Sequence, residues 1–251
     1  MCGRYAAVLP PEALQQLYGL LNRLDMPPRY NIQPTQPIGV VWQEHGQRTA
    51  QLVRWGYVPG WVKDPREFSL LINARAETMA EKPSFRDAVK HSRCVVPALG
   101  YYEWMTGPDG KKRPYFITRA DGETMSMAGL YSHWSGAQGE EVDTACIVTV
   151  TPNLDLSSVH DRMPAVLMDK DAVDAWLDTG TVNGKAAAEL CHAPPLGTLL
   201  AYRVGKAVGS TKSEGPDLIH PLEDNDDETP APQPPKAKAA GGGGGGQLDL
   251  F

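Results

Sequence analysis

Residues 38–55, with the sequence IGVVWQEHGQRTAQLVRW, decide the fold class of this chain. Two runs rich in apolar residues, 38–42 and 51–55, flank the polar turn Glu44-His45-Gly46-Gln47. Short apolar runs on either side of a glycine-containing turn are typical of a β-hairpin. The stretch therefore predicts two neighbouring antiparallel strands.

The same pattern recurs along the chain. A second hairpin is expected to turn at residues 107–110, joining a strand over 94–104 to one over 114–119. Further strands are predicted over 1–9, in a run that ends near Ile72, over 125–134 and over 145–151. Helices are predicted from Pro10 as far as Leu21, over 84–91, and from the cap residue Asp169 to Leu177. Hairpins in place of βαβ units predict an α+β fold: a mainly antiparallel, barrel-like domain with peripheral helices.

The globular pattern ends near Leu222. An acidic run, a proline-rich run and six glycines fill most of residues 223–246. Such a composition buries too little apolar surface to offset its ordering entropy, which predicts a disordered linker. The last five residues, QLDLF, are apolar again. We expect one domain over 2–222, a linker over 223–246 and a terminal motif over 247–251.

The net charge of −6 is unevenly distributed. Residues 216–251 hold seven acidic residues and two lysines, whereas the other 215 residues hold 23 acidic and 22 basic ones. A near-neutral body can still carry a basic face, so composition neither supports nor excludes nucleic acid as a partner. The chain has no run of about 18 apolar residues and no signal-peptide pattern. These features predict a cytoplasmic, nucleoid-associated protein without membrane contact.

The four cysteines are spaced like neither a zinc site nor a disulfide framework, so we expect no metal and no cofactor. Cys94 and Cys146 lie in apolar, β-like runs, and Cys191 follows a helical stretch. All three are predicted to be inert. Cys2 differs because removal of Met1 makes it the N-terminal residue.

An N-terminal cysteine carries an α-amine and a thiol on neighbouring carbons, with ordinary pKa values of about 8 and about 8.5. The amine can condense with an aldehyde to a Schiff base, and the thiol can then close a five-membered thiazolidine. An internal cysteine has no free amine and cannot react in this way. The alternative interpretation is that a cysteine at position two is incidental.

Four polar residues stand beside apolar or aromatic ones. Asn73 and Arg75 follow an apolar run and share a face if that strand continues, where Arg75 could bind a phosphate and Asn73 a hydroxyl. Glu103 is embedded among aromatics, and burial there raises a carboxyl pKa toward a range useful for acid–base chemistry. His160, beside Asp161, is the best candidate histidine. Structural or solvated roles are the competing interpretation for each.

Two tryptophans are candidates for base stacking. Trp61 ends the glycine- and proline-rich loop 55–61, and Trp104 follows Glu103. Stacking of one base on an aromatic side chain contributes about 1–3 kcal/mol and suits single strands. A place in the core is the competing interpretation for both.

Together these segments resemble the SRAP (SOS-response-associated peptidase) family of abasic-site processing proteins. The matching pieces occur in family order over roughly residues 2–220: Met1-Cys2-Gly3-Arg4-Tyr5, Arg29-Tyr30-Asn31, Trp55-Gly56, Ile72-Asn73-Ala74-Arg75-Ala76-Glu77, Arg93-Cys94, Tyr102-Glu103-Trp104 and His160-Asp161-Arg162-Met163-Pro164. Family members can carry a tryptophan pair in the loop, whereas here Val62 follows Trp61.

The resemblance implies a function and a set of site residues. It implies that Cys2 crosslinks covalently to abasic sites in single-stranded DNA through a thiazolidine, and so protects the lesion during replication. It is compatible with self-removal of Met1 by a cysteine-type peptidase activity, and it leaves open whether the protein also has lyase activity. The implied catalytic residues are Cys2, Asn73, Glu103 and His160, and the implied DNA-binding residues are Arg4, Trp61, Arg75, Trp104 and Arg162. The protein is expected to act as a monomer.

The terminal pentapeptide resembles the sliding-clamp-binding motif of bacteria. Leu248, Leu250 and Phe251 would fill an apolar pocket, and Gln247 would be the polar anchor. A linker of some 24 residues would keep the tethered domain close to DNA at the clamp. The alternative is a sticky end without a partner.

Two other functions fit the same residues. An N-terminal-nucleophile peptidase or amidohydrolase also uses a processed cysteine, with the α-amine as its base. A non-catalytic reader of damaged DNA would use the basic and aromatic residues and would tolerate Cys2→Ala. The three functions differ in their product: a stable DNA adduct, a cleaved amide or no covalent change.

Overall fold

A computed structural model describes residues 2–222, so the expected linker and the motif at 247–251 lie outside the described residues. The elements are β1 Tyr5–Ala7, α1 Pro11–Tyr18, β2 Arg29–Ile32, β3 Pro37–Glu44, β4 Gln47–Trp55, η1 Pro65–Glu67, β5 Asn73–Arg75, α2 Ala76–Met79, α3 Arg86–His91, β6 Arg93–Ala98, β7 Gly100–Thr106, β8 Lys112–Arg119, β9 Met125–Ser135, β10 Glu141–Val150, β11 Met163–Pro164, β12 Val166–Leu167, α4 Lys170–Leu177, α5 Gly184–Glu189, β13 Leu199–Arg203, η2 Lys206–Gly209 and η3 Pro216–Ile219.

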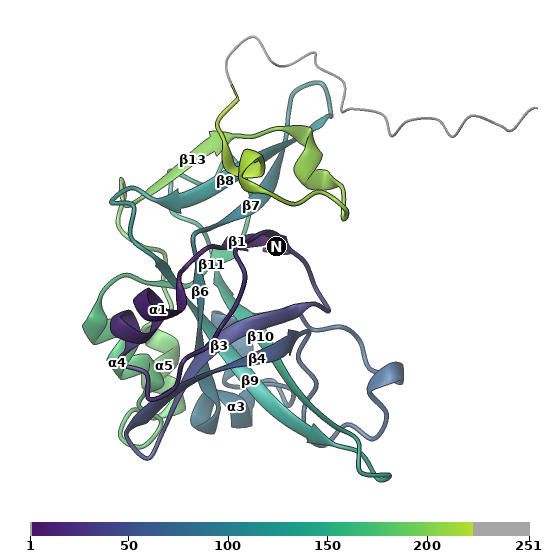
Figure 1. The fold of residues 1–251 in the computed structure, drawn as a ribbon, viewed down its shortest axis with the longest axis vertical. Helices are drawn as coiled ribbons and strands as arrows, with labels where there is room; N and C mark the ends of the chain where they lie inside the picture. The colour runs from purple at the N-terminus through teal and green to yellow at the C-terminus, as the bar shows by residue number, and fades with distance from the viewer. Residues whose placement is uncertain (1, 223–251) are drawn as a thin grey trace, which may run out of the picture.

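Within residues 2–222, a closed barrel forms the lower half of the molecule (Figure 1). Its strands follow the order β10-β4-β3-β6-β9, and β9 pairs back onto β10 to close the ring. The pairs are antiparallel except those of β10 with β4 and with β5. The predicted α+β, mainly antiparallel, barrel-like fold is confirmed.

The hairpin of residues 38–55 is present as β3 and β4, paired from Pro37 with Arg54 to Glu44 with Gln47. His45 and Gly46 form its two-residue turn with φ values of 49° and 75°. Positive φ at both central residues matches the right-handed twist of the flanking strands. The predicted hairpin is therefore confirmed, with its turn at the expected residues.

The prediction of a single strand over residues 94–104 is wrong. The structure divides it into β6, which belongs to the barrel, and β7, which belongs to a second sheet of order β13-β8-β7-β1-β2. The break falls at Leu99, and an added Cβ at Gly100, the first residue of β7, would lie 2.4 Å from the carbonyl oxygen of Ile117. The absence of a side chain lets β7 leave the barrel and pass close to β8 (Figure 1).

Two other predicted strands are shorter than expected, because each pairs with its neighbours over only a few residues. The strand over 1–9 is confined to β1, Tyr5–Ala7, which pairs with β7 on one side and β2 on the other. The run ending near Ile72 does not form a strand up to that point, and β5 begins at Asn73. It pairs with β10 beyond the last pair that β10 makes with β4.

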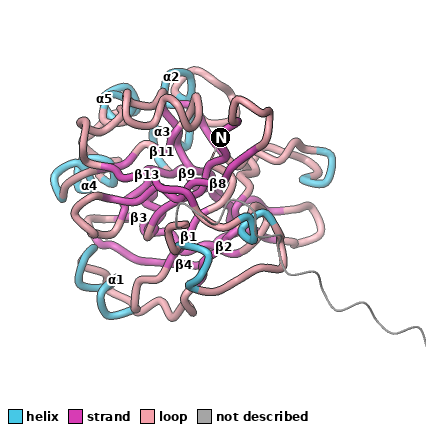
Figure 2. Tube along the Cα trace, turned by 90° about the horizontal axis from the view of Figure 1, so that it is seen from above, coloured by secondary structure: helices cyan, strands magenta, loops and turns pink. Residues whose placement is uncertain are grey.

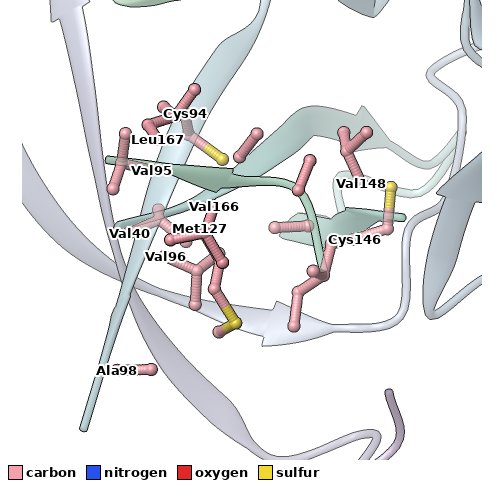
Figure 3. Packing of buried hydrophobic residues seen from close by; sticks show 14 of the residues in the cluster. Val40, Cys94, Val95, Val96, Ala98, Met127, Cys146, Val148, Val166 and Leu167 are labelled. Atoms are coloured by element: carbon pink, nitrogen blue, oxygen red, sulfur yellow. The ribbon is translucent and has the colours of Figure 1, made fainter. Parts of the chain in front are cut away.

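The barrel interior is filled by aliphatic and sulfur-containing side chains (Figure 3). Cys94 and Cys146 are fully buried among them, and burial raises the pKa of both thiols. Cys191 is also buried and unpaired. A thiol with so high a pKa carries almost no thiolate, as expected for cysteines that act as small apolar residues.

The helices cover the barrel rather than connect parallel strands. Helix α1 ends at Tyr18, short of Leu21, because Gly19 takes a left-handed conformation with φ of 65°. Asp169 caps α4 as predicted, accepting a hydrogen bond from the amide of Ala172. Helices α2, α3 and α5 gather at one edge and α1 lies at the opposite edge (Figure 2). Among residues 2–222, no helix is long and apolar enough to cross a membrane.

Candidate functional site

Cys2 lies where the chain enters the second sheet. Just before β1, the amide of Tyr102 donates to the carbonyl of Arg4 at 2.9 Å, which continues the β1–β7 pairing toward Cys2. Its side chain is fully buried, with Sγ 4.0 Å from the carbonyl oxygen of Arg4. Burial, and then the nearby carboxylate of Glu103, raise the pKa of the thiol. Burial therefore favours the neutral thiol over the thiolate.

Glu103 comes from β7 and reaches the same place. Its side chain is 5% exposed, and burial raises the pKa of its carboxyl above the usual 4.5. The raised pKa predicted from its aromatic surroundings is confirmed in direction. Its Oε2 lies 3.8 Å from Nε2 of His160, which is 28% exposed. The structure thus brings together a buried thiol, a buried carboxyl of raised pKa and an imidazole.

His160 is held by its own neighbours in the chain. Its Nδ1 lies 2.7 Å from Oδ1 of Asp161 and 3.0 Å from the amide nitrogen of Arg162. A protonated Nδ1 can donate to the carboxylate, and an unprotonated one can accept from the amide. The ring therefore has a partner for either state, while Nε2 points toward Glu103.

An open cleft of about 810 Å³ adjoins these groups. Glu103, Trp104 and His160 line it, whereas Cys2 and Asn73 do not. Lys112 and Ser158 also line it. Sequence reasoning missed both, although Lys112 pairs with Thr106 across the predicted second hairpin and Ser158 closely precedes His160.

Asn73 and Arg75 lie on β5 with different exposure. Asn73 is half-buried, and its Nδ2 donates to the carbonyl of Ile147 at 3.4 Å. No described residue donates a hydrogen bond to its buried Oδ1. Arg75 is exposed. Packing connects this strand to the N-terminus, because Trp55 donates to the carbonyl of Ile72 and its ring packs edge-on against Tyr5.

Two of the predicted DNA-binding residues make contacts inside the protein. Arg4 donates to Oδ1 of Asn31 at 3.1 Å and to the carbonyl of Val208, and its guanidinium lies 5.8 Å from the Trp104 ring. Arg162 forms a two-point ion pair with Glu77 at 2.8 and 2.9 Å. Its side chain is 12% exposed. Both arginines are thus fixed in place, and their long-range partners gave no signal in the sequence.

Trp61 is the most accessible of the predicted aromatic contacts. It is 59% exposed and packs edge-on against Phe68 at 5.9 Å between ring centroids. The next residue, Val62, is buried against Trp134. The loop therefore presents one aromatic side chain outward where some family members can carry two. The four predicted clamp-binding residues lie outside the part of the chain that the structure describes.

The fold and site define a class: a small barrel protein in which a cysteine near the N-terminus lies beside a glutamate–histidine pair that lines an open cleft. The SOS response associated peptidase (SRAP) family model matches residues 1–211. The chain belongs to the SRAP family.

Two bacterial relatives are similar to this chain over nearly their whole length. The abasic site processing protein YedK of Escherichia coli is 34% identical, over 88% of this chain and all of that protein. YoqW of Bacillus subtilis, with the same description, is 32% identical over 87% of this chain and 99% of its own. A crystal structure of a protein from Bacteroides thetaiotaomicron has a TM-score of 0.78 and 25% identity, and covers 88% of this chain and all of its own.

Proposed function

We propose that this protein captures abasic sites in single-stranded DNA by a covalent bond to Cys2 after Met1 is removed. One observation carries the proposal: the N-terminal cysteine is buried next to a carboxyl of raised pKa that faces an imidazole across 3.8 Å. The relatives described as abasic site processing proteins support the choice of substrate.

The proposed reaction releases one water. The α-amine of Cys2 attacks the aldehyde carbon of the opened sugar, and loss of water gives a Schiff base. The sulfur then adds to the same carbon while its proton passes to the imine nitrogen, which closes a thiazolidine. Because burial keeps the thiol neutral, the amine reacts first and the thiol gives up its proton only in the second step.

Glu103 and His160 supply the proton transfers in this scheme. An abasic sugar is mostly a closed hemiacetal, so its ring oxygen must gain a proton before the aldehyde is free. Glu103 keeps its proton to a higher pH than an ordinary carboxyl, which suits it to that step. His160, with partners for both states of Nδ1, would pass protons between Glu103 and solvent.

The remaining predicted residues would hold the strand. The buried Oδ1 of Asn73 offers an acceptor for a sugar hydroxyl. Exposed Arg75 and Trp61 would contact a phosphate and a base. Trp104, in the cleft wall, would stack on a second base, with Arg4 over its ring. Arg162 would contact the strand while its ion pair with Glu77 fixes its position.

A single-stranded oligonucleotide with one abasic site tests this function. We expect a band shifted on a denaturing gel with the wild-type protein and none with Cys2→Ala. Cys191→Ala is the matched control, because that cysteine is buried inside the chain and has no free α-amine, and it should crosslink as the wild type does. A shifted band of equal strength with Cys2→Ala would contradict the proposal.

Peptide-bond hydrolysis is a second candidate, favoured by the family description as a peptidase. In this version Cys2 takes part in removal of Met1. The mass of the purified protein shows whether Cys2 is needed to remove Met1. In a host that lacks methionine aminopeptidase, self-removal predicts that a Cys2→Ala variant keeps Met1. Loss of Met1 from that variant would exclude self-removal. We further propose lyase activity after Schiff-base formation, which would appear as a cleaved strand.

We also propose that residues 247–251 bind a bacterial sliding clamp, and that the protein works at the nucleoid. The support is the sequence alone: two leucines and a phenylalanine beside Gln247, after six glycines. A tethered domain would meet single-stranded lesions where replication exposes them.

A further inference from the structure

A second cavity, with a basic lining, lies apart from the cleft beside Cys2. It encloses about 520 Å³, within the range of small-molecule sites, between α3, α5 and the segment that joins α4 to α5. Arg86, Lys90 and His91 line one wall and Lys185 lines another. The two cavities share no lining residue.

Charge around this cavity is strongly one-sided. None of its described lining residues is acidic. Of the nearby carboxylates, Asp178 is occupied by Thr181 and by two backbone amides, and Asp87 lies 3.9 Å from Arg86. Arg86, Lys90 and Lys185 are exposed at the mouth. Because Arg86 is paired with Asp87, the positive charge that is open to a ligand comes mainly from Lys90 and Lys185.

A buried guanidinium adds to the positive field. Arg93 is 1% exposed, and it donates to the carbonyls of Val89, Trp176, Asp178 and Val182. Its hydrogen-bond partners are neutral carbonyls, so they satisfy the donors and leave the charge in place. Two of those carbonyls belong to the 178–182 segment that walls the cavity. Arg93 thus fixes that wall, and its charge offsets that of the Asp178 carboxylate in the same segment.

We propose that this cavity binds a phosphate group. Guanidinium and ammonium donors on opposite walls are the groups that hold a phosphate in proteins. Two sources share this chemistry: a free phosphorylated small molecule and a phosphate of the DNA strand. A DNA strand held by Arg75, as the proposed function has it, would lie close to this cavity. Only the four residues of α2, about 6 Å of helix, separate exposed Arg75 from Ala80 at the cavity rim.

The test uses the full chain and two probes, inorganic phosphate and deoxyadenosine monophosphate, titrated by calorimetry. Lys90→Gln and Arg86→Gln each remove one charge from the cavity, whereas Lys111→Gln removes one from the exposed β7–β8 turn. Loss of one charged hydrogen bond corresponds to about tenfold weaker binding. We expect that loss in both cavity variants and unchanged binding in Lys111→Gln. No binding to the wild type, or an equal loss in Lys111→Gln, would overturn the proposal.

A second arm identifies the source with an oligonucleotide that has no abasic site, measured by fluorescence anisotropy. Equal weakening of oligonucleotide and nucleotide binding by Lys90→Gln assigns the site to the DNA strand. Unchanged oligonucleotide binding, with nucleotide binding lost, assigns it to a free ligand. The two proposals can also fail separately. If the wild type forms no crosslink but Cys2→Ala still binds the nucleotide, the proposed function is wrong and the phosphate site stands.

Discussion

At the scale of residues, Glu103 carries both a structural cost and the proposed chemistry. Burial disfavours its charged form, so the folded protein binds its proton more tightly than the unfolded chain does. Between the ordinary carboxyl pKa and the raised folded one, stability therefore falls as pH rises. The buried carboxyl therefore lowers the stability of the folded protein at neutral pH. The same raised pKa makes it a better proton donor than an ordinary glutamate.

Glu103→Gln should move stability and activity in opposite directions. At pH 7 we expect a higher thermal midpoint than the wild type, because the buried charge is gone. The difference should shrink as pH falls below 4.5, where the wild-type carboxyl is protonated in both states. The crosslinking rate at pH 7 should fall by about 100-fold, the lower end of what general acid–base catalysis supplies. A variant that is less stable at pH 7, or that crosslinks at the wild-type rate, would contradict this role.

Local context predicted some residue properties and could not predict others. The aromatic neighbours of Glu103 indicated its burial and raised pKa, and Trp61 in a Gly/Pro loop is exposed as a stacking residue must be. The full burial of Cys2 depends on β7, about a hundred residues away. The Arg162–Glu77 pair spans 85 positions, and no periodicity in one sequence indicates such a partner.

At the scale of elements, the joint between β6 and β7 positions the site. Strand β6 completes the barrel, and β7 carries Glu103 into the second sheet beside β1. Backbone passes so close at Gly100 that a methyl group there would lie 2.4 Å from a carbonyl oxygen. The joint therefore aligns Glu103 with Cys2 through backbone geometry.

Gly100→Ala should destabilise the fold. Forcing an extra methyl into a filled space costs about 1–3 kcal/mol, and here the nearest atom belongs to backbone that cannot rotate away. Gly205→Ala is the control, since an added Cβ at that position meets nothing within 4 Å. Its effect should stay within about 0.5 kcal/mol. Urea unfolding of both variants gives the comparison, and equal stability would show that the joint tolerates a side chain.

Elements set by local signals were predicted well, and those set by distant pairing were not. The β3–β4 turn and the Asp169 cap are each determined by a few neighbouring residues, and both are present as predicted. The division of 94–104 into two strands reflects the approach of β8, which arrives later in the chain. Parallel pairing of β10 with β4 joins barrel strands some 90 residues apart, which the hairpin pattern does not contain.

At the scale of the whole molecule, the chain combines a folded domain with a tail that the sequence marks as different. Residues 216–251 hold most of the net negative charge, with −5 of the total −6. An acidic segment is repelled by the phosphates of DNA, so these residues should add nothing to the affinity for a strand. We attribute targeting to the tail and chemistry to the domain.

Deletion of residues 247–251 should separate these two roles. We expect the shortened protein to lose binding to the bacterial sliding clamp in a pull-down, because the leucines and Phe251 are the apolar contacts of the proposed motif. Its crosslinking to an isolated abasic oligonucleotide should equal that of the full chain. The exchange Leu248→Ala with Phe251→Ala serves as a control of unchanged length. Undiminished clamp binding by either variant would refute the assignment.

The most direct measurement is the mass of the N-terminal peptide recovered from the crosslink with abasic DNA. We predict a peptide that begins at Cys2, carries the sugar with loss of one water, gains no hydrogens on borohydride treatment and has no thiol open to alkylation. Those properties belong to a thiazolidine and not to a Schiff base. An adduct on a lysine, an adduct peptide that retains Met1, or a Cys2 thiol that alkylates freely would contradict the account.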